Sequence, residues 1–360
     1  MTGGLEGEEM GINKNDFGMT RDGKEAFIYT LANKNGMSAE VTDYGATLVA
    51  VSTPDKNGRL DDVLLGYEDV TDYIENGGYL GATVGRNCNR VKGAQVSING
   101  QVFELDKNEN GNDLHSGFHG YDSFIWDAQI IQEENAVMFS RMSPDGEQGF
   151  PGNFKVSVKY TLTEENELKI QYSGKCDQDT IANMTNHSYF NLAGQDAGEI
   201  TGHILQLEAD AYLPVDEESI PTGEIREVAG TPFDFREPKA IGRDMGADDE
   251  QLRLAHGYDH NFLLRGGCME VRKIAEVMEP ESGRTMEVYT DCPGIQLYTG
   301  NFLENTQIGK EGVVYGPHHG FCMETQFYPD TPHHDEFPSS ILKAGEEYSS
   351  ITIYKFGIRV

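Results

Sequence analysis

A carboxylate, Glu324, interrupts an apolar run in the stretch GFCMETQFYPD at residues 320–330. Successive side chains of a β-strand point to opposite faces. The two faces of the predicted strand therefore carry Cys322, Glu324 and Gln326 on one side and Phe321, Met323, Thr325 and Phe327 on the other. Glu324 lies either in solvent on an outer face or in a cleft as an acid or base, and alternation alone leaves both interpretations open.

Two histidines stand in surroundings that suit chemistry. His187 lies in NMTNHSYFNLAG, where amide side chains could bind hydroxyls and Tyr189 and Phe190 could form an apolar wall. His115 lies among glycines in NDLHSGFHGYDSFIW, and glycine lets the backbone approach a ligand closely. Each stretch also has a simpler explanation, because asparagines close turns and loop histidines are commonly exposed.

Four further polar residues stand in or beside strand-like segments. Asn89 and Arg90 follow an apolar strand in GATVGRNCNRV, Asp259 stands in HGYDHNFLL, and Gln296 interrupts GIQLYTGN. Taken singly, a solvated strand end or a turn-forming aspartate explains them. Taken with the glutamate and the two histidines, they match polyol sites, in which carboxylates and amides bind hydroxyls and aromatic rings cover the apolar side. We therefore predict a sugar-binding cleft.

Signatures of other chemistry are missing or broken. GMTRDGKE at residues 18–25 has the spacing of a phosphate loop, but Glu25 replaces the Ser or Thr that binds magnesium, and a strand follows instead of a helix. The histidine doublets 318–319 and 333–334 offer one metal ligand to each face of a strand. Dinucleotide, hydrolase-elbow and His-Glu-x-x-His motifs are absent from the sequence. We expect no metal and no cofactor.

Segments in which apolar and polar residues alternate, separated by turn residues, predict the β-strands that position these side chains. AFIYTLANKNGMSAEVTDYG, AQVSINGQVFEL, KVSVKYTLTEENELKIQYSG and KIAEVMEPESGRTMEVYT each predict a hairpin, and residues 69–76 are one short helix candidate. This pattern is typical of an all-β sandwich or barrel. No linker or repeat divides the chain, so we predict one domain over residues 1–360, with residues 1–15 as a flexible extension and long loops around His115 and from Pro214 to Asp249.

Composition excludes several partner classes. The 360 residues carry a formal charge of -32, which disfavours nucleic acid and anionic membranes as partners. Five widely spaced cysteines without a Cys-x-x-Cys pair are typical of reduced, packed thiols. The sequence shows neither an apolar run long enough for a membrane span nor a signal-peptide pattern, so we expect a cytoplasmic protein.

Six motifs together resemble one family, the aldose 1-epimerases or galactose mutarotases. The motifs are GRNCNRV, LHSGFHGYDSFIW, TNHSYFNL, YLPVDEESIPTGEI with TPFDFR, GYDHNF and METQFYPD, and they cover nearly the whole chain. The resemblance implies an all-β, antiparallel, galactose mutarotase-like supersandwich with an open sugar cleft. It implies that Glu324 is the general base, His187 the general acid and His115 a second histidine at the ring oxygen. It further implies hydroxyl-binding roles for Asn89, Arg90, Asp259 and Gln296.

Three departures from the family pattern stand out. Ser116 replaces a usual Gly after His115, Cys88 replaces a common Ala before Asn89, and Ala344 replaces a frequent Pro near the end. Ser116 is the departure that bears on the site, because it could alter the loop that carries His115.

The implied reaction interconverts the α and β anomers of an aldohexose such as galactose or glucose. A base removes the proton of the C1 hydroxyl while an acid protonates the ring oxygen, each contributing roughly 100- to 10,000-fold. We expect Glu324 and His187 to be ionised together, each charge favouring the other. Two alternatives remain, a hexose-phosphate epimerase, which needs a basic cluster, and a non-catalytic carbohydrate-binding protein, which needs no acid and base. The preferred free aldose, the pathway and the choice between monomer and homodimer stay open.

Overall fold

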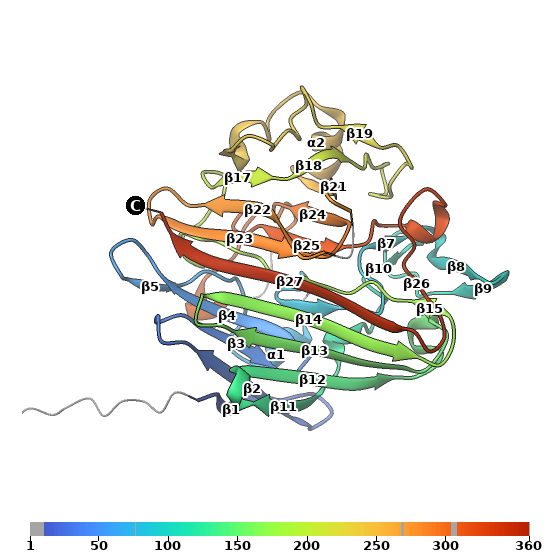
Figure 1. Ribbon diagram of the computed structural model, residues 1–360, viewed down its shortest axis with the longest axis horizontal. Coiled ribbons are helices and arrows are strands. Elements are labelled where there is room, and N and C mark those ends of the chain that lie inside the picture. Colours follow the sequence, from blue (N-terminus) through green and yellow to red (C-terminus); the bar gives the residue numbers. More distant parts are fainter. Residues whose placement is uncertain (1–10, 76, 268–269, 304–307, 360) are drawn as a thin grey trace, which may run out of the picture.

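One large antiparallel sheet dominates the computed structural model, which describes residues 11–75, 77–267, 270–303 and 308–359 (Figure 1). Alternating apolar residues give this sheet one face toward the core. Its nine strands are, in spatial order, β11 (Asp127–Ile131), β12 (Ala136–Ser143), β13 (Phe154–Leu162), β14 (Glu167–Cys176), β27 (Glu347–Ile358), β23 (Arg284–Thr290), β22 (Arg272–Met278), β17 (Ile204–Leu207) and β20 (Lys239–Ala240).

Two five-stranded sheets complete most of the fold. The first contains, in order, β1 (Asn13–Met19), β2 (Glu25–Ala32), β3 (Ser38–Thr42), β4 (Thr47–Pro54) and β5 (Leu60–Asp62). The second contains β19 (Arg226–Glu227), β18 (Ala209–Tyr212), β21 (Asp259–Leu264), β24 (Gly294–Tyr298) and β25 (Cys322–Gln326). The second sheet carries three of the predicted site residues.

The described residues also form four two-stranded pairs. They are β7 (Arg90–Val91) with β10 (Asp113–Leu114), β8 (Gln95–Ile98) with β9 (Gln101–Glu104), β6 (Ala82–Val84) with β16 (Thr185–His187), and β15 (Thr180–Ile181) with β26 (Ile341–Leu342). Three of these pairs, β7–β10, β6–β16 and β15–β26, join segments that are separated in the sequence.

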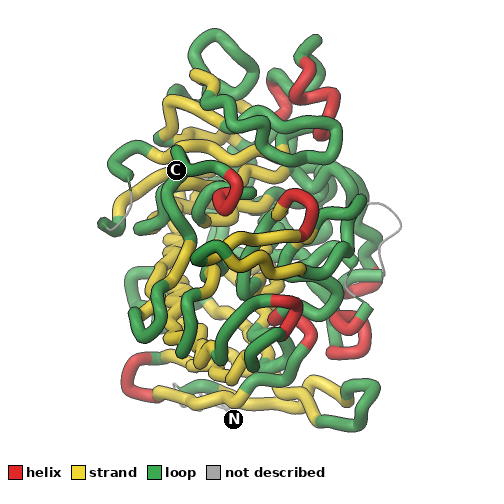
Figure 2. The backbone as a smooth tube through the Cα atoms, turned by 90° about the vertical axis from the view of Figure 1, so that its right-hand side faces the viewer, coloured by secondary structure: helices red, strands yellow, loops and turns green. Residues whose placement is uncertain are grey.

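The described helices, red in Figure 2, are few and short, and the strands, yellow in the same view, make up much more of the chain. The predicted helix at 69–76 is confirmed as α1 (Val70–Ile74), with Asp69 as its N-cap accepting from the Thr71 amide. A second helix, α2 (Glu250–Ala255), was not expected and is capped by Asp249. The 3-10 turns are Lys92–Ala94, Tyr121–Ser123, Gln132–Glu134, Glu147–Gly149, Ile241–Arg243, Lys310–Gly312 and Thr331–His333. Among the described helices, none has the length and apolar character to cross a membrane.

The four predicted hairpins are confirmed as the pairs β2–β3, β8–β9, β13–β14 and β22–β23. At the β8–β9 turn, Asn99 and Gly100 have φ of 53° and 78°, as a tight hairpin turn requires. The segment that looked like a phosphate loop is the turn between β1 and β2, where the Thr20 amide donates to the Lys24 carbonyl.

A continuous buried cluster joins the layers. It runs from Tyr29 on β2 through Tyr160 on β13 and Phe262 on β21 to Phe356 on β27, so side chains of different sheets meet in one core. The all-β antiparallel fold is therefore confirmed, and we keep the single domain over residues 1–360 as a proposal.

The structure bears on two further expectations, the flexible N-terminal extension and the reduced, packed cysteines. β1 begins at Asn13, so residues 13–15 of the expected extension belong to a strand, and residues 1–10 lie outside the described part. Cys88, Cys176, Cys292 and Cys322 are buried free thiols, as expected, and Cys268 lies outside the described residues.

Candidate active site

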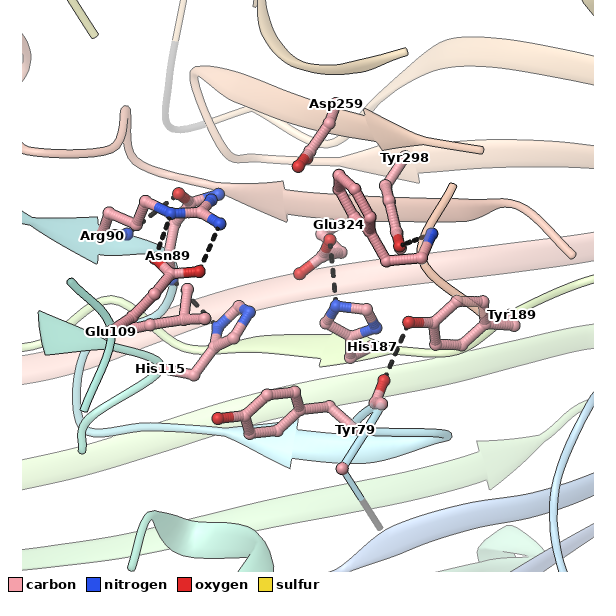
Figure 3. Close-up of a pocket in the computed structure, with 14 residues that line it drawn as sticks. Tyr79, Asn89, Arg90, Glu109, His115, His187, Tyr189, Asp259, Tyr298 and Glu324 are labelled. Atoms are coloured by element: carbon pink, nitrogen blue, oxygen red, sulfur yellow. Dashed lines mark hydrogen bonds and ion pairs between the residues drawn. The ribbon is translucent and has the colours of Figure 1, made fainter. Parts of the chain in front are cut away.

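A cavity of about 270 Å³ opens beside β25 and collects most of the predicted residues (Figure 3). Its walls come from segments that are far apart in sequence. They are formed by Gly77, Gly78, Tyr79, Asn89, Arg90, Glu109, Leu114, His115, His187, Tyr189, Asp259, Tyr298, Phe302 and Glu324. Six of the seven predicted site residues thus meet at one cavity.

Glu324 occupies the centre of β25 and is 2% exposed, so it does not lie on a solvated outer face. All five residues of β25 are buried, on both faces of the strand. The Oε1 atom lies 3.7 Å from Nε2 of His187, which is longer than a hydrogen bond. The buried Oε2 atom has no hydrogen-bond partner among the described residues. An unsatisfied carboxylate oxygen at a cavity wall is suited to accept a proton or a hydroxyl.

His187 ends β16 and is held by aromatic rings and a thiol. The ring centroids of Tyr189 and Tyr79 lie 5.0 and 5.9 Å from the His187 ring centroid. The Nδ1 atom of His187 lies 3.5 Å from Sγ of Cys322, two residues before Glu324 on the same face of β25. This packing directs Nε2 toward the carboxylate (Figure 3).

His115 is fixed by the backbone of the Asn89 segment. The amide of Asn89 donates to Nδ1 of His115 at 3.1 Å, so a neutral His115 ring carries its proton on Nε2. Ser116 has a φ of 69°, in the left-handed region that glycine favours, and its hydroxyl exchanges two 2.8 Å hydrogen bonds with the amide and carbonyl of Asn87. The serine therefore joins the loop of His115 to the segment that carries Asn89.

Arg90 is paired with a residue that the sequence patterns did not indicate. Its Nε and Nη2 atoms donate to the carboxylate of Glu109 at 2.6 and 2.9 Å. Glu109 belongs to the long loop before His115, and no local pattern marks it. A bidentate pair of this kind fixes the guanidinium plane at the cavity wall.

Asp259 and Gln296 belong to neighbouring strands of the second five-stranded sheet. Nε2 of Gln296 donates to Oδ1 of Asp259 at 2.7 Å. Asp259 lines the cavity, whereas Gln296 is buried and is not among the lining residues. The hydroxyl-binding role expected for Gln296 stays a prediction.

Aromatic residues supply much of the remaining wall. Tyr189 lines the cavity, and its hydroxyl donates to the Gly78 carbonyl at 2.8 Å. Phe190, expected beside it, instead packs in the core with a ring centroid 4.8 Å from that of Tyr354. Both residues follow the end of β16, and of the two only Tyr189 lines the cavity. Tyr79, Tyr298 and Phe302 also line the cavity and were not predicted.

Burial sets the protonation of the acid and base candidates. It lowers the pKa of His187 to about 4 and, together with the nearby Asp259 charge, raises the pKa of Glu324 well above its usual value. Burial also lowers the pKa of His115 and raises that of Asp259, which Arg90 and Gln296 partly oppose. Desolvation thus disfavours both charges, which opposes the expectation that Glu324 and His187 are ionised together.

Ligand atoms of His115, His187 and Glu324 lie within 4.8 Å of one another, a grouping found at no other place in the described residues. Nδ1 of His115 is already taken by the Asn89 amide, and Nδ1 of His333, from one of the doublets, contacts Asp330 at 2.6 Å. We assign none of these residues to a metal, and the expectation of a metal-free, cofactor-free site stays a prediction.

Comparisons with known proteins agree along nearly the whole chain. A family model described as aldose 1-epimerase matches residues 28–355. The galactose mutarotase of Rattus norvegicus is 42% identical over 96% of this chain and 99% of its own length. That of Homo sapiens is 44% identical over 89% and 92%, and the aldose 1-epimerase of Escherichia coli strain K12 is 40% identical over 93% and 96%.

A solved structure supports the same comparison at the level of the fold. The crystal structure of galactose 1-epimerase from Lactobacillus acidophilus NCFM has a TM-score of 0.85 and 31% identity, covering 98% of this chain and all, 100%, of that one. The arrangement of sheets described above therefore has a counterpart among solved structures.

Proposed function

This chain belongs to the aldose 1-epimerase family, and we propose from that premise how its cleft interconverts the α and β anomers of an aldohexose. The protein is an isomerase with a sugar substrate, such as galactose or glucose. The roles of individual residues are our proposal. Glu324 acts as the general base at the C1 hydroxyl, and His187 acts as the general acid at the ring oxygen.

The reaction begins with a transfer of protons through the sugar. The Glu324 carboxylate takes the C1 hydroxyl proton, the electrons form the C1 carbonyl as the bond to the ring oxygen breaks, and His187 protonates that oxygen. Rotation about the C1–C2 bond presents the other carbonyl face. In closure, neutral His187 takes the proton back and protonated Glu324 returns its own, so both groups are reset.

The shifted pKa values suit this exchange. A lowered pKa makes His187 a stronger acid, and a raised pKa makes Glu324 a stronger base. Ring opening converts a charged pair into a neutral pair, which the buried site favours. Since Oε1 and Nε2 are 3.7 Å apart, beyond hydrogen-bond range, the proposal requires the sugar to connect them.

The remaining polar residues hold the sugar. His115 donates from Nε2, while Asn89, Arg90 and Asp259 bind hydroxyls, so that only C1 and its neighbours move. Arg90 is the only lysine or arginine on the described cavity wall and is paired with Glu109, and this favours a neutral sugar over the hexose-phosphate alternative. A cytoplasmic location and a monomer or homodimer stay proposals.

The observation that carries the proposal is the His187–Glu324 approach across the cavity, and Glu324→Gln tests it. The amide keeps the size of the side chain but cannot accept the C1 proton, so turnover falls about 100- to 10,000-fold. Polarimetry of freshly dissolved α-galactose and α-glucose measures turnover, and calorimetry shows that sugar binding is retained.

Two further variants complete the test. Glu347→Gln, an exposed change at the start of β27, serves as the matched control and keeps full turnover. His187→Asn keeps the fold and loses turnover to a similar degree. Near-normal mutarotation by Glu324→Gln would refute the base assignment.

A further inference from the structure

A second cavity, of about 590 Å³, lies on the outer face of the nine-stranded sheet. It crosses β11, β12, β13, β14 and β27, which lie side by side (Figure 1). The inner face of the same sheet packs against β25, where the hydroxyl of Thr352 hydrogen-bonds with that of Thr325. Among the described residues, none lines both this cavity and the sugar cavity, so the two are separate sites. We call the second cavity the serine groove. It is lined by Gln129, Met138, Ser140, Lys155, Val156, Ser157, Ser173, Gly174, Lys175, Glu347, Tyr348 and Ser349.

A row of four serines forms the floor of the serine groove. Ser140 on β12 pairs with Ser157 on β13, Ser157 with Ser173 on β14, and Ser173 with Ser349 on β27. Residues two positions away along each strand share this face and carry longer side chains, so the serines form a trough between flanking rows about 13 Å apart. The Oγ atoms of Ser157 and Ser173 lie 2.7 Å apart. One of the two hydroxyls donates to the other, and the accepting hydroxyl keeps its own hydrogen for a ligand.

Two exposed lysines stand on one side of the serine row. Lys155 and Lys175 lie directly opposite each other on β13 and β14. Like charges in this position destabilise a sheet. Neither ammonium group has an ion-pair partner among the described residues, although Glu347 lies in register with Lys175 on the next strand. The fold therefore keeps two adjacent positive charges uncompensated at the edge of the groove.

Other lysines on the same face are paired. The ammonium of Lys159 lies 2.9 Å from the carboxylate of Glu134, and that of Lys169 lies 3.0 Å from the carboxylate of Glu167. Lys355 also pairs with Glu167. The chain has 60 acidic residues against 28 basic ones, so partners for lysine are plentiful. The contrast favours a role for the unpaired lysines in binding an anion.

We propose that the serine groove binds a phosphate monoester of a polyol. The phosphate lies over Ser157 and Ser173, where it meets the ammonium groups of Lys155 and Lys175 and accepts a hydrogen bond from a serine hydroxyl. The Glu347 carboxylate repels the phosphate and accepts hydrogen bonds from hydroxyls, so it directs the polyol toward β27. The site is separate from the sugar cavity, and the inference does not rest on the proposed function.

Glycerol 3-phosphate is the probe, because it has no ring to open and the acidic wall of the sugar cavity disfavours an anion. Phosphorus NMR gives a Kd of about 1 mM, and amide chemical shifts of the protein place the probe at Ser157, Ser173 and Lys175. Inorganic phosphate binds about threefold more weakly, because it lacks the hydroxyls that Glu347 accepts. Glycerol alone leaves the amides of the serine groove unshifted.

Three variants test the residues that hold the phosphate. Lys155→Gln and Lys175→Gln each raise the Kd of glycerol 3-phosphate about fivefold, and together they raise it about 25-fold. Neither change lowers the melting temperature, because each removes a like-charge pair. Ser173→Val fills the floor with a side chain that suits a strand and abolishes binding. Mutarotation, measured by polarimetry on the same samples, stays at the native rate in all three variants.

Lys159→Gln is the matched control. It makes the same charge change on the same face, but its ammonium is already held by Glu134, so the Kd changes less than about twofold. An equal rise in Kd in this control would overturn the site, since net charge alone would then attract the anion. Amide shifts confined to the sugar cavity would also overturn it. Inorganic phosphate binding as tightly as glycerol 3-phosphate would contradict the polyol part. Loss of mutarotation in the unmodified protein contradicts the proposed function and leaves these results unaffected.

Discussion

At the scale of single residues, Glu324 and His187 are best treated as a pair that shares one proton. Burial disfavours the charge on each of them, because it lowers the pKa of His187 to about 4 and raises that of Glu324. The reactive form has the same total number of protons, with the carboxylate ionised and the imidazole protonated. Coupled groups titrate as a unit, so the pH dependence of catalysis reports the pair.

The Glu324–His187 pair predicts that kcat/KM falls on the acid side of its pH profile at an unusually low pH. Below the pKa of His187, a second proton enters the pair and removes the base, so kcat/KM falls as pH drops through about 4. The profile stays level above that pH until Glu324 loses the shared proton at its raised pKa. Polarimetry with the spontaneous rate subtracted, alongside circular dichroism to confirm folding, measures the limb. A limb centred on the ordinary histidine pKa of about 6.5 would show that burial does not control His187.

Sequence patterns identified site residues where an unusual polar side chain interrupts an apolar strand. Glu324 was found this way, Asp259 was found just ahead of an apolar run, and both line the cavity. Glu109 and Phe302 also line it but stand in polar loops, where charged and aromatic residues carry no signal. Gln296 interrupts a strand as Glu324 does, yet it lies behind the wall. Pattern alone does not separate a residue on the cavity wall from one buried behind it.

At the scale of elements, the hairpins could be predicted from the sequence, whereas the packing of one sheet against another could not. Turn residues such as Asn99 and Gly100 act locally, so the pairing of β8 with β9 follows from a short stretch of sequence. β25 is buried on both faces because strands distant in sequence, including β16 and β27, lie around it. Alternation could therefore assign residues to faces of β25 but could not say which face lines a cleft.

The loop that carries His115 offers a test at this scale. Ser116→Ala keeps the left-handed backbone and removes both bonds to Asn87, so the free energy of unfolding falls by about 1–3 kcal/mol. Ser116→Gly loses the same bonds but relieves the φ of 69°, which returns about 1 kcal/mol. Urea unfolding measures both, and kcat/KM falls in each because Asn89 and His115 lose their alignment. An alanine variant as stable as the native protein would mean that the hydroxyl does not hold the loop.

At the scale of the whole molecule, the charge of the chain and the charge of the cleft have the same sign. The formal charge is -32, and the cavity wall carries Glu109, Asp259 and Glu324 against Arg90. Such a field repels phosphorylated sugars on approach and leaves neutral sugars unaffected. Neutral substrates therefore let the protein combine a strongly acidic surface with an acidic site.

Acidic residues inside the fold make global stability depend on pH, and Asp113 has the clearest effect. Asp113 on β10 is fully buried, and desolvation raises its pKa to about 8, with the Asp106 charge adding to the shift and the Ser116 amide opposing it. In the unfolded chain its pKa is close to 3.8. Between these values the folded state binds one more proton than the unfolded state, so stability falls as pH rises from about 4 to about 8.

Asp113→Asn removes this dependence while keeping the size of the side chain. The native protein loses up to about 1.4 kcal/mol per pH unit through this group, whereas the variant loses nothing there. Asp43 and Asp122, whose pKa values burial raises to about 6, contribute equally to both proteins. Melting temperatures from pH 5 to 8 therefore decline less steeply in the variant, and the difference between the two curves isolates Asp113. Parallel curves would mean that Asp113 is ionised in the fold and that its burial is compensated.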